Sequence, residues 1–311
     1  MKSSWPSPSE SPLEARLPFV FPARVGRDLR IIGLIVLLLA TIIQGRAGEL
    51  ADIKKCPSAL HQAYIPAGKF WMGSTKEERE FAYRLDKQVT RGYGWYEKET
   101  RRKAKTGGYC MDRDPVTNSQ YKIFIDETGR PQPTITPEAY QRQGFLAHPY
   151  DKVKEFLWRE GSFPSGRQDH PVVLASLDDA KSYCAWMGER TKRKSRLPTE
   201  VEWEKAARGT DGRIFPWGNE WHSSYLNSGE RFGTTTPVSR FPEGKSPYGL
   251  FDMVGNVFEW TAARWDEEKF VVKGCSWDDL PGTCRAAMRH GRPPQSKHIL
   301  IGFRCASDLD L

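Results

Sequence analysis

The hydrophobic positions of the chain begin with one short apolar run near the N-terminus. This run covers 31–43, is thirteen residues long and follows three arginines. A membrane-spanning helix needs roughly twenty apolar residues, so the run is short for a span. The small-x-small pattern that ends at Ala47 is typical of a signal-peptide cleavage site. We therefore predict a signal peptide over 1–47, with an uncleaved membrane anchor as the alternative, and a linker over 48–62.

Beyond the linker, apolar residues recur at helical spacing in three places. A serine or threonine followed three residues later by an acid is typical of a helix N-terminus, and a glycine is typical of a helix end. Ser176 and Thr199 begin such patterns, and Gly209 follows the last of them. The spacing predicts helices over 119–128, over 180–188 and from Thr199 to Gly209.

The predicted strands are shorter than the helices. A Pro-Ala-Gly turn in the middle of 63–74 predicts a hairpin, and no helical period returns after Gly209. The polar segment 75–107 and the irregular segment 130–168 interrupt the pattern as insertions. The sequence therefore predicts one α+β domain over 63–307 with little regular secondary structure. Further short strands are expected within 109–118 and at 170–175, 269–273 and 301–305.

The composition supports a loop-rich fold that is packed by aromatic side chains, with 11 Trp, 27 Gly and 22 Pro. The formal charge is +8, and residues 1–47 supply +3 of it, from six Lys/Arg and three Asp/Glu. The remaining +5 mixes acids with bases and accompanies no nucleic-acid-binding motif, so we predict no nucleic-acid partner. The basic segment 98–105 is predicted to be solvated surface, with a partner-binding or membrane-surface role as the alternative.

The segment 248–260 holds two acids, Asp252 and Glu259, on either side of a Gly-Asn pair. A helix does not run easily through Gly-Asn, so the segment predicts a tight loop. Carboxylates at both ends of a loop, with carbonyl groups between them, are the hard oxygen ligands that calcium takes. From spacing alone, a turn that has an acid at each end remains the alternative.

All six cysteines follow the predicted signal peptide. An even number of cysteines in an exported protein predicts disulfides, and six cysteines allow fifteen pairings. The chain has no CxxC motif and no Cys/His cluster with zinc-ligand spacing, so we predict no structural zinc site. The histidines are scattered, and no Ser/His/Asp arrangement or phosphate-binding loop stands out.

The order of the motifs along residues 60–307 resembles the formylglycine-generating enzyme, or sulfatase-modifying factor, family. This resemblance implies a C-type-lectin-like fold of the formylglycine-generating-enzyme type, which agrees with the low content of regular structure. The resemblance is carried by the stretches 65–73, Pro115-Val-Thr-Asn118, His170-Pro-Val172, Arg196-Leu-Pro-Thr-Glu-Val-Glu-Trp203, Ala206-Ala-Arg-Gly209, Phe215-Pro-Trp-Gly-Asn219, 248–260, Gly274-Cys-Ser-Trp277 and Gly302-Phe-Arg304.

The resemblance also implies structural calcium. In the family, the 248–260 loop binds one ion through a first acid or amide, two carbonyl groups and a final glutamate. A second family ion would fall on a shortened loop in which a glutamate replaces the usual aspartate. The implied ligands are Asp252, Gly255, Val257 and Glu259 for the first ion, and Asn227, Ser228, Glu230 and Phe232 for the second.

Oxidising members of the family use two cysteines, five residues apart, to bind copper(I) and activate oxygen, because soft thiolates suit that ion. The pair should follow the Gly-x-Ser-aromatic motif. Here that interval is short, and Cys284 matches a structural cysteine of the family, while Cys275 stands where the family has Gly. Ser276 matches the family's substrate-contacting serine. The alternative is that Cys275 and Cys284 form an unusual copper-binding or redox-active pair.

The resemblance further implies the disulfide pairing. Cys184 and Cys305 match a bridge of the family. The usual partner of Cys284 has become Ala207, which frees Cys284 to pair with Cys275. The remaining bridge would then join Cys56 to Cys110.

These observations predict an extracytoplasmic protein, periplasmic or secreted, that binds or matures a protein or peptide partner without oxidising it. A sulfatase or an exported redox enzyme would suit as partner, and the membrane would be contacted only through an uncleaved N-terminal segment. The alternative is an active oxidase that converts a sulfatase cysteine to formylglycine through Cys275 and Cys284. A weaker alternative is a calcium-dependent, lectin-like surface module.

Overall fold

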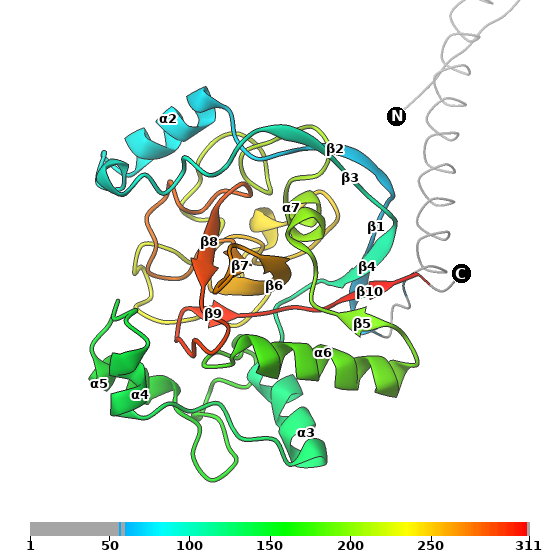
Figure 1. Cartoon of the computed structure of the whole chain (residues 1–311), viewed down its shortest axis with the longest axis vertical. Coiled ribbons are helices and arrows are strands. Elements are labelled where there is room, and N and C mark those ends of the chain that lie inside the picture. Colours follow the sequence, from blue (N-terminus) through cyan, green and yellow to red (C-terminus); the bar gives the residue numbers. More distant parts are fainter. Residues whose placement is uncertain (1–55, 57–59, 310–311) are drawn as a thin grey trace, which may run out of the picture. The chain divides into compact units, whose positions relative to one another are not determined.

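A long antiparallel ribbon forms the first part of the fold in the computed structural model, which describes Cys56 and residues 60–309 (Figure 1). The strands β1 (Gln62–Ile65) and β2 (Gly68–Met72) run along one side of the ribbon. The strands β3 (Arg102–Thr106) and β4 (Tyr109–Asp112) return along the other. The predicted signal peptide or anchor over 1–47 lies outside the described residues.

The pairing within this ribbon corrects the hairpin predicted over 63–74. β1 pairs with β4 and β2 pairs with β3, so the two strands of the predicted hairpin do not pair with each other. One register runs through both pairings, from Gln62 opposite Asp112 to Met72 opposite Arg102. The Pro-Ala-Gly segment is therefore a bend within one side of the ribbon. Of the insertion predicted over 75–107, residues 75–99 close the far end, whereas Arg102–Thr106 form β3 and belong to the ribbon.

Two four-stranded sheets complete the strand framework. The first has the order β1-β4-β10-β5, in which β10 is Ala306–Asp308 and β5 is Ser195–Arg196. The second has the order β8-β7-β6-β9, and its strands are β6 (Phe258–Arg264), β7 (Phe270–Lys273), β8 (Arg289–Arg292) and β9 (Ile301–Gly302). β9 runs parallel to β6, whereas the other pairings are antiparallel. This mixture of short strands and separate helices confirms the α+β prediction.

The three predicted helices are present, and each begins with a capping box. They are α3 (Asn118–Thr128), α6 (Leu177–Thr191) and α7 (Glu200–Arg208). Each cap is a serine or threonine whose hydroxyl accepts from the backbone N–H three residues later, while the third helical residue accepts from the cap's own N–H. Because these signals are local, the sequence predicted the starts of the helices well.

Three further helices lie in the insertions, where no helix was predicted. They are α2 (Lys76–Leu85), α4 (Pro137–Arg142) and α5 (Tyr150–Val153). Short 3₁₀ turns also occur at Arg91–Tyr93, Lys154–Phe156 and Pro242–Gly244. The strand expected at 170–175 is wrong, since this segment makes only the single bridge between Thr117 and Pro171. No helix in the described part of the chain is long and apolar enough to cross a membrane.

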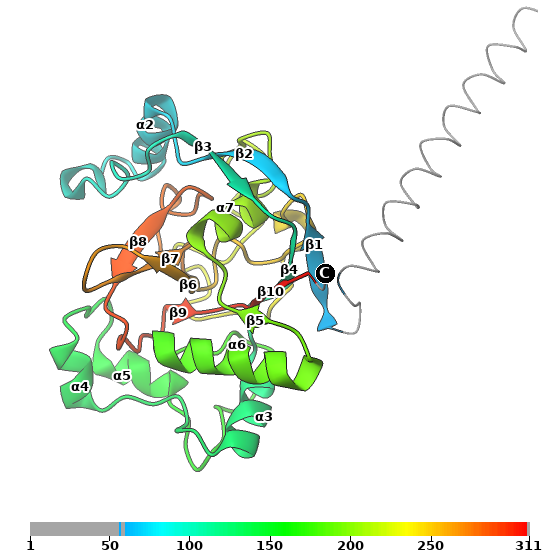
Figure 2. The same cartoon turned by 45° about the vertical axis from the view of Figure 1, so that its right-hand side comes forward.

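Aromatic rings fill the main core between α3, α6 and the second sheet. Tyr121 stacks on Tyr183 at 5.7 Å between ring centroids, and both rings meet the edge of Phe303. α6 lies below the sheets, and α3 packs beneath it in both views (Figure 1, Figure 2). Cys184 on α6 forms a disulfide with Cys305, which fastens this helix to the chain just before β10.

A buried ion pair joins the two four-stranded sheets. The Nε and Nη2 atoms of Arg304 donate to the two carboxylate oxygens of Glu259 at 2.8 and 2.7 Å. The same guanidinium donates to the carbonyl oxygens of Asp112, at the end of β4, and of Phe251. The indole of Trp203 on α7 also donates to Glu259, at 2.7 Å. Both charged side chains are fully buried, so each depends on the other for its charge balance.

Replacing Arg304 with methionine should therefore leave a buried, unpaired carboxylate. We expect Arg304→Met to lower the free energy of unfolding by about 3–5 kcal/mol, measured by urea denaturation. Arg91→Met removes an exposed ion pair with Glu80 and should change stability little. The double variant Glu259→Gln/Arg304→Met should recover part of the loss. Equal stability of the single and double variants would contradict this account.

Candidate functional site

Three loops meet beside the second sheet: 252–257, 227–232 and 275–284. Asn256, in the first of them, connects all three. Its backbone N–H donates to the carbonyl of Asn227 at 2.9 Å, and its own carbonyl accepts from the N–H of Trp277 at 3.0 Å. Its side-chain amide exchanges two hydrogen bonds with the backbone of Thr236. Gly255 precedes it with a φ of 86°, and a Cβ there would lie 2.8 Å from the carbonyl oxygen of Asn227. The Gly-Asn pair is thus required by this close approach of loops.

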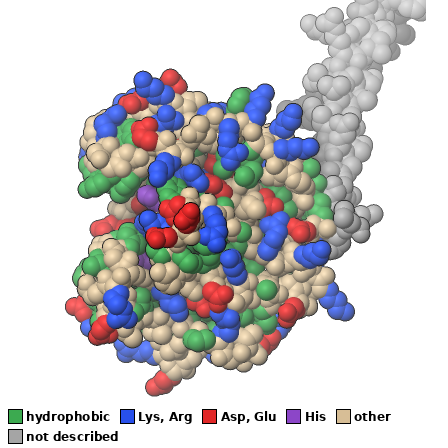
Figure 3. Space-filling model, in the orientation of Figure 1, with side chains coloured by type: hydrophobic (Ala, Val, Ile, Leu, Met, Phe, Trp, Pro, Cys, Tyr) green, Lys and Arg blue, Asp and Glu red, His purple; other side chains and the backbone are tan. Residues whose placement is uncertain are grey.

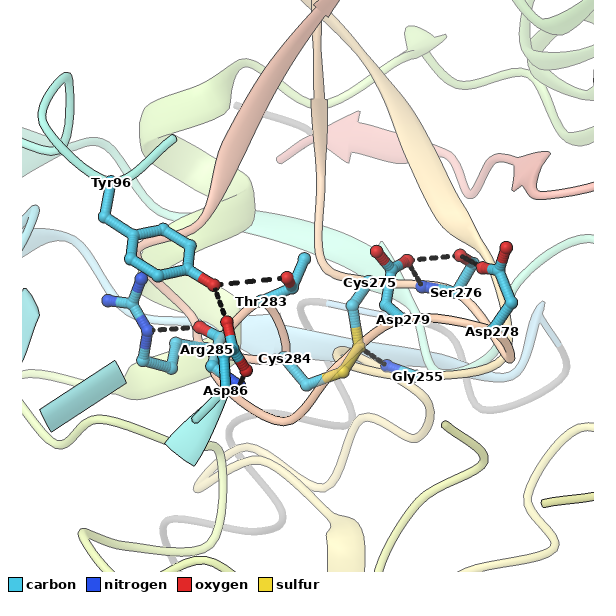
Figure 4. Close-up of a disulfide and its surroundings, with 11 residues drawn as sticks. Asp86, Tyr96, Gly255, Cys275, Ser276, Asp278, Asp279, Thr283, Cys284 and Arg285 are labelled. Carbon is cyan, nitrogen blue, oxygen red and sulfur yellow. Dashed lines mark hydrogen bonds between the residues drawn. A yellow bond between two sulfur atoms is a disulfide. The ribbon is translucent and has the colours of Figure 1, made fainter. Parts of the chain in front are cut away.

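The third of these loops runs from Cys275 to Cys284 and is called the site loop below. Its two ends are joined by a disulfide, and both cysteines are fully buried (Figure 4). The backbone N–H of Gly255 points at the Cys275 sulfur, 3.0 Å away. Reagents in solvent therefore do not reach this disulfide without movement of the surrounding loops.

Two carboxylates fill the first turn of the site loop. The Ser276 hydroxyl donates to Asp278 at 2.6 Å and also lies within hydrogen-bond distance of Asp279. The Ser276 backbone N–H donates to Asp279 at 2.8 Å (Figure 4). Ser276 is fully buried, and its hydroxyl is used inside its own loop. The hydroxyl of Ser276, which the resemblance matched to a substrate-contacting serine, thus faces acids of its own loop.

Both insertions hold the site loop. On one side, Asp86 of the first insertion accepts from the Gly282 backbone N–H at 2.6 Å, and its other oxygen accepts from the hydroxyls of Thr90 and Tyr96. Arg285, just beyond the loop, forms a two-pronged ion pair with Glu99 at 2.8 and 2.9 Å. All of these carboxylates are buried. The first insertion is therefore docked on the site loop by charge-assisted hydrogen bonds.

On the other side, His148 of the second insertion lies against the site loop. Its Nε2 atom is 2.9 Å from Asp278 Oδ2, and its ring stacks on Trp277 at 4.8 Å. The side chains of His148 and Asp278 are 12% and 15% exposed, so this pair is the part of the network that touches solvent. The loop is thus clamped between two insertions that are far apart in sequence.

Burial changes the protonation of the acids around the three loops. Burial and, to a smaller extent, the neighbouring Asp278 carboxylate raise the pKa of Asp279 to about 7. Burial likewise raises the pKa of Asp252 to about 7, although Arg304 opposes this shift. The Asp279 carboxyl group can therefore hold a proton close to neutral pH. The ionisable groups of the site loop are therefore carboxyl groups, whose oxygen atoms are hard ligands.

The segment 227–232 is the remaining loop of the three. The Gly229 backbone N–H donates to the carbonyl of Asp279 at 2.9 Å, and that of Glu230 donates to the carbonyl of Trp277 at 2.8 Å. Asn227 is fully buried, and its Oδ1 atom has no hydrogen-bond partner. A buried amide oxygen without a donor is unusual, because it loses its hydration without compensation.

Comparison with known proteins identifies the family. The family model described as "Sulfatase-modifying factor enzyme 1-like domain" matches residues 49–309, which is most of the chain. The chain belongs to the sulfatase-modifying factor family. The resemblance that the motifs indicated is thereby confirmed.

Two curated members of this family illustrate the range of the matches. Inactive C-alpha-formylglycine-generating enzyme 2 of Bos taurus is 30% identical, over 88% of this chain and 95% of that protein. Formylglycine-generating enzyme of Mus musculus is 31% identical, over 78% of this chain and 74% of that protein. Identity alone therefore does not separate a catalytic member of the sulfatase-modifying factor family from an inactive one.

Solved structures agree on the fold. PvdO from Pseudomonas aeruginosa superposes with a TM-score of 0.61 at 24% identity, covering 82% of this chain and 97% of that chain. CarF superposes with a TM-score of 0.52 at 18% identity, covering 81% of this chain and 99% of that chain. These similarities confirm the fold of the formylglycine-generating-enzyme type.

The cysteines of this sulfatase-modifying factor domain are all paired. The three disulfides are Cys56–Cys110, Cys184–Cys305 and Cys275–Cys284, the same pairs that the sequence analysis anticipated. No free cysteine remains. Between Cys275 and Cys284 the site loop carries Asp278 and Asp279 but no further thiol. A copper(I) ion would find no thiolate pair here unless the buried disulfide were reduced, so the residues as arranged do not fit copper.

The two predicted calcium sites fit unequally. In the first, Asp252 is buried and its Oδ2 accepts one backbone N–H, from Ser239, so a cation would suit it. Glu259, however, has both oxygens engaged by Arg304 and Trp203. In the second, the unpartnered Oδ1 of Asn227 fits a cation directly. The donor set of the second site therefore suits calcium better than that of the first.

The sequence analysis missed the polar partners of the site loop. His148 was grouped with scattered histidines, and the Asp278-Asp279 pair was noted only as part of a short interval. Two adjacent acids beside a family motif were the available signal. No local signal joined Asp278 to His148, which lies 130 residues away.

Because the folded state raises the pKa of Asp279, the site loop should make stability depend on pH. The unfolded carboxyl titrates near pH 4, so the folded state binds the proton more tightly between about pH 4 and pH 7. This contribution to stability is fully present below about pH 4 and is lost as the pH rises towards about 7. We expect Asp279→Asn, which keeps an acceptor for Ser276, to weaken that decline in urea-denaturation series at several pH values.

The matched control is Asp178→Asn on the exposed surface of α6, which should leave the parent's decline in place. Equal slopes for the parent protein and Asp279→Asn would contradict the raised pKa.

Proposed function

We propose that this protein binds or matures a protein or peptide partner outside the cytoplasm and does not convert its partner's cysteine to formylglycine. The state of the cysteines carries this proposal. All six are in disulfides, and Cys275 and Cys284 are fully buried. Two hard carboxylates occupy the loop in which the oxidising members of the family hold a thiolate pair. Oxygen activation on copper(I) needs that soft pair.

The relatives support the proposal without deciding it. One of the similar proteins, from Bos taurus, is named an inactive formylglycine-generating enzyme, and it aligns along nearly its whole length. Its name indicates that this fold can persist without the oxidase reaction. An active enzyme aligns at almost the same identity. The chemistry of the site loop is therefore the stronger argument.

Three disulfides support a location outside the cytoplasm, either periplasmic or secreted, because such bonds persist in oxidising compartments. The partner would then be another exported protein, of which a sulfatase or a redox enzyme are examples. The pair formed by His148 and Asp278, whose side chains are 12% and 15% exposed, is the part of the site loop network that such a partner would contact.

A direct assay separates partner binding from oxidation. The purified protein is incubated with a cysteine peptide that carries a sulfatase motif, together with copper(I) and oxygen, and aldehyde is measured with a hydrazide probe. We expect no aldehyde from the parent protein or from Cys284→Ser, because neither presents a thiolate pair. An active formylglycine-generating enzyme under the same conditions is the positive control. Aldehyde that forms with the parent and disappears in Cys284→Ser would establish the oxidase alternative instead.

We further propose that calcium acts as a structural ion at the loops around Asn256, and chiefly at the 227–232 loop. A bound calcium ion supplies positive charge to fixed oxygen ligands and joins the chain segments that carry them. The buried Oδ1 atom of Asn227 would gain the partner that it otherwise lacks. The Nδ2 atom of Asn227 already donates to the carbonyl of Thr234 at 2.9 Å. This hydrogen bond directs the Oδ1 atom of Asn227 away from Thr234.

If this is correct, a chelator should lower the melting temperature of the parent protein, and added calcium should restore it. Asn227→Ala should lose most of that response. Asn118→Ala is the matched control, because Asn118 is also buried and also donates to a backbone carbonyl, that of Arg167. The control should lose stability and keep its response to calcium. A parent protein that melts identically with and without chelator would contradict the calcium proposal.

A further inference from the structure

One face of the β2–β3 ribbon carries cations on both strands. We call it the basic ribbon face and define it by five residues: Lys69 and Trp71 on β2, Arg101 just before β3, and Lys103 and Lys105 on β3. In the strand register Lys69 lies opposite Lys105, and Trp71 lies opposite Lys103. Blue side chains gather over β2 and β3 at the upper right of Figure 3.

Alternation along the strands creates this face. Successive strand residues point to opposite sides. Phe70 and Met72 on β2 and Ala104 on β3 are buried on the inner side, where Val201 of α7 packs against them. The residues between them are therefore forced outward, and three of these four are lysines: Lys69 on β2, and Lys103 and Lys105 on β3. The sequence analysis left this segment open as solvated surface or as a partner-binding surface.

The charges of the basic ribbon face are poorly balanced. Arg101 pairs with Glu78 at 2.7 Å. No ion pair to the three exposed lysines occurs within the described part of the chain, where a pair means nitrogen and oxygen within 4.0 Å. Lys69 and Lys105 also lie directly opposite each other, and like charges in this position destabilise a strand pair. A polyanion bound to this face would relieve that repulsion.

Trp71 holds two of the cations in place. It is 39% exposed, and its ring lies 5.3 Å from the Arg101 guanidinium and 5.1 Å from the Lys103 ammonium. A ring that is covered by cations is less free to insert into lipid or to stack on a nucleic-acid base. The face therefore suits a ligand that presents repeated negative groups along an extended chain.

We propose that the basic ribbon face binds an anionic polysaccharide through its sulfate or carboxylate groups. Side chains two positions apart on a strand are about 7 Å apart and paired ones about 5 Å apart, which is a suitable grid for acidic groups repeated along a glycan. The choice of a polysaccharide among polyanions rests on the extracytoplasmic location given under the proposed function. The binding itself does not depend on partner maturation or on oxidase chemistry.

The test uses heparin as the probe and the full-length protein. We expect salt-dependent binding at about 0.15 M salt, and a loss of affinity of about tenfold or more in the triple variant Lys69→Glu/Lys103→Glu/Lys105→Glu. The corresponding triple arginine variant should bind like the parent, because it keeps the charges. The matched control reverses three exposed lysines on other elements: Lys181, Lys194 and Lys245. Circular dichroism checks that every variant is folded.

Several outcomes would overturn the proposal. These are no binding of the parent to heparin, equal binding by the parent and the triple glutamate variant, and an equal loss in the control variant, which would indicate a general charge effect. Tighter binding to anionic vesicles or to single-stranded DNA than to heparin would assign the face to a different class of partner. Aldehyde formation in the oxidase assay would leave these results unaffected, so the two proposals fail separately.

Discussion

The ion pair between Glu259 and Arg304 is the constraint on which the rest of this structure depends. The fold has short strands and long loops, so few backbone ladders hold its parts together. One guanidinium instead satisfies a carboxylate on β6 and carbonyl groups at the end of β4 and at Phe251. A buried charge without its partner destabilises the folded state. The two sheets therefore cannot separate without exposing one of these groups to solvent or leaving it buried and unpaired. Trp203 brings α7 to the same point.

The loops that define the site are built outward from this pair. The 252–257 loop leads directly into β6, and Asn256 then fixes the segments at Asn227, Thr236 and Trp277 by backbone and amide hydrogen bonds. The site loop is therefore placed by polar contacts and not by regular secondary structure. Its polar character follows from the same cause, because each buried donor and acceptor must find a partner.

The features that could be predicted from the sequence are those marked by a short local pattern or by a fixed order of motifs along the chain. The capping signals at Ser176 and Thr199 predicted two helices, helical spacing predicted the third over 119–128, and the order of the family motifs predicted the fold. The hairpin was wrong because the partners of β1 and β2 lie between 30 and 50 residues along the chain, beyond an insertion. Helix α2 was missed although Thr75 and Glu78 form a capping box at its start, because only Ala82 and Tyr83 of its residues are buried and its apolar spacing is short.

The site was predictable to a smaller extent. The motifs located Ser276 and the loop of Asp252, but they could not show that the Ser276 hydroxyl serves the acids of its own loop. They also could not show that Arg304 donates hydrogen bonds to the Glu259 carboxylate, since the two residues are 45 positions apart. Long-range pairing of buried charges has no sequence period, so only the folded chain reveals it.

The contrast between soft and hard ligands explains how one scaffold can serve different chemistries. The fold supplies a short, clamped loop beside the second sheet, whatever side chains the loop carries. A thiolate pair in such a loop would select a soft metal ion, whereas Asp278 and Asp279 present hard oxygen atoms instead. The clamps at Asp86 and His148 contact the loop through its backbone and its acids, not through its sulfurs. These contacts involve no thiolate, so they do not depend on which metal-binding side chains the loop carries.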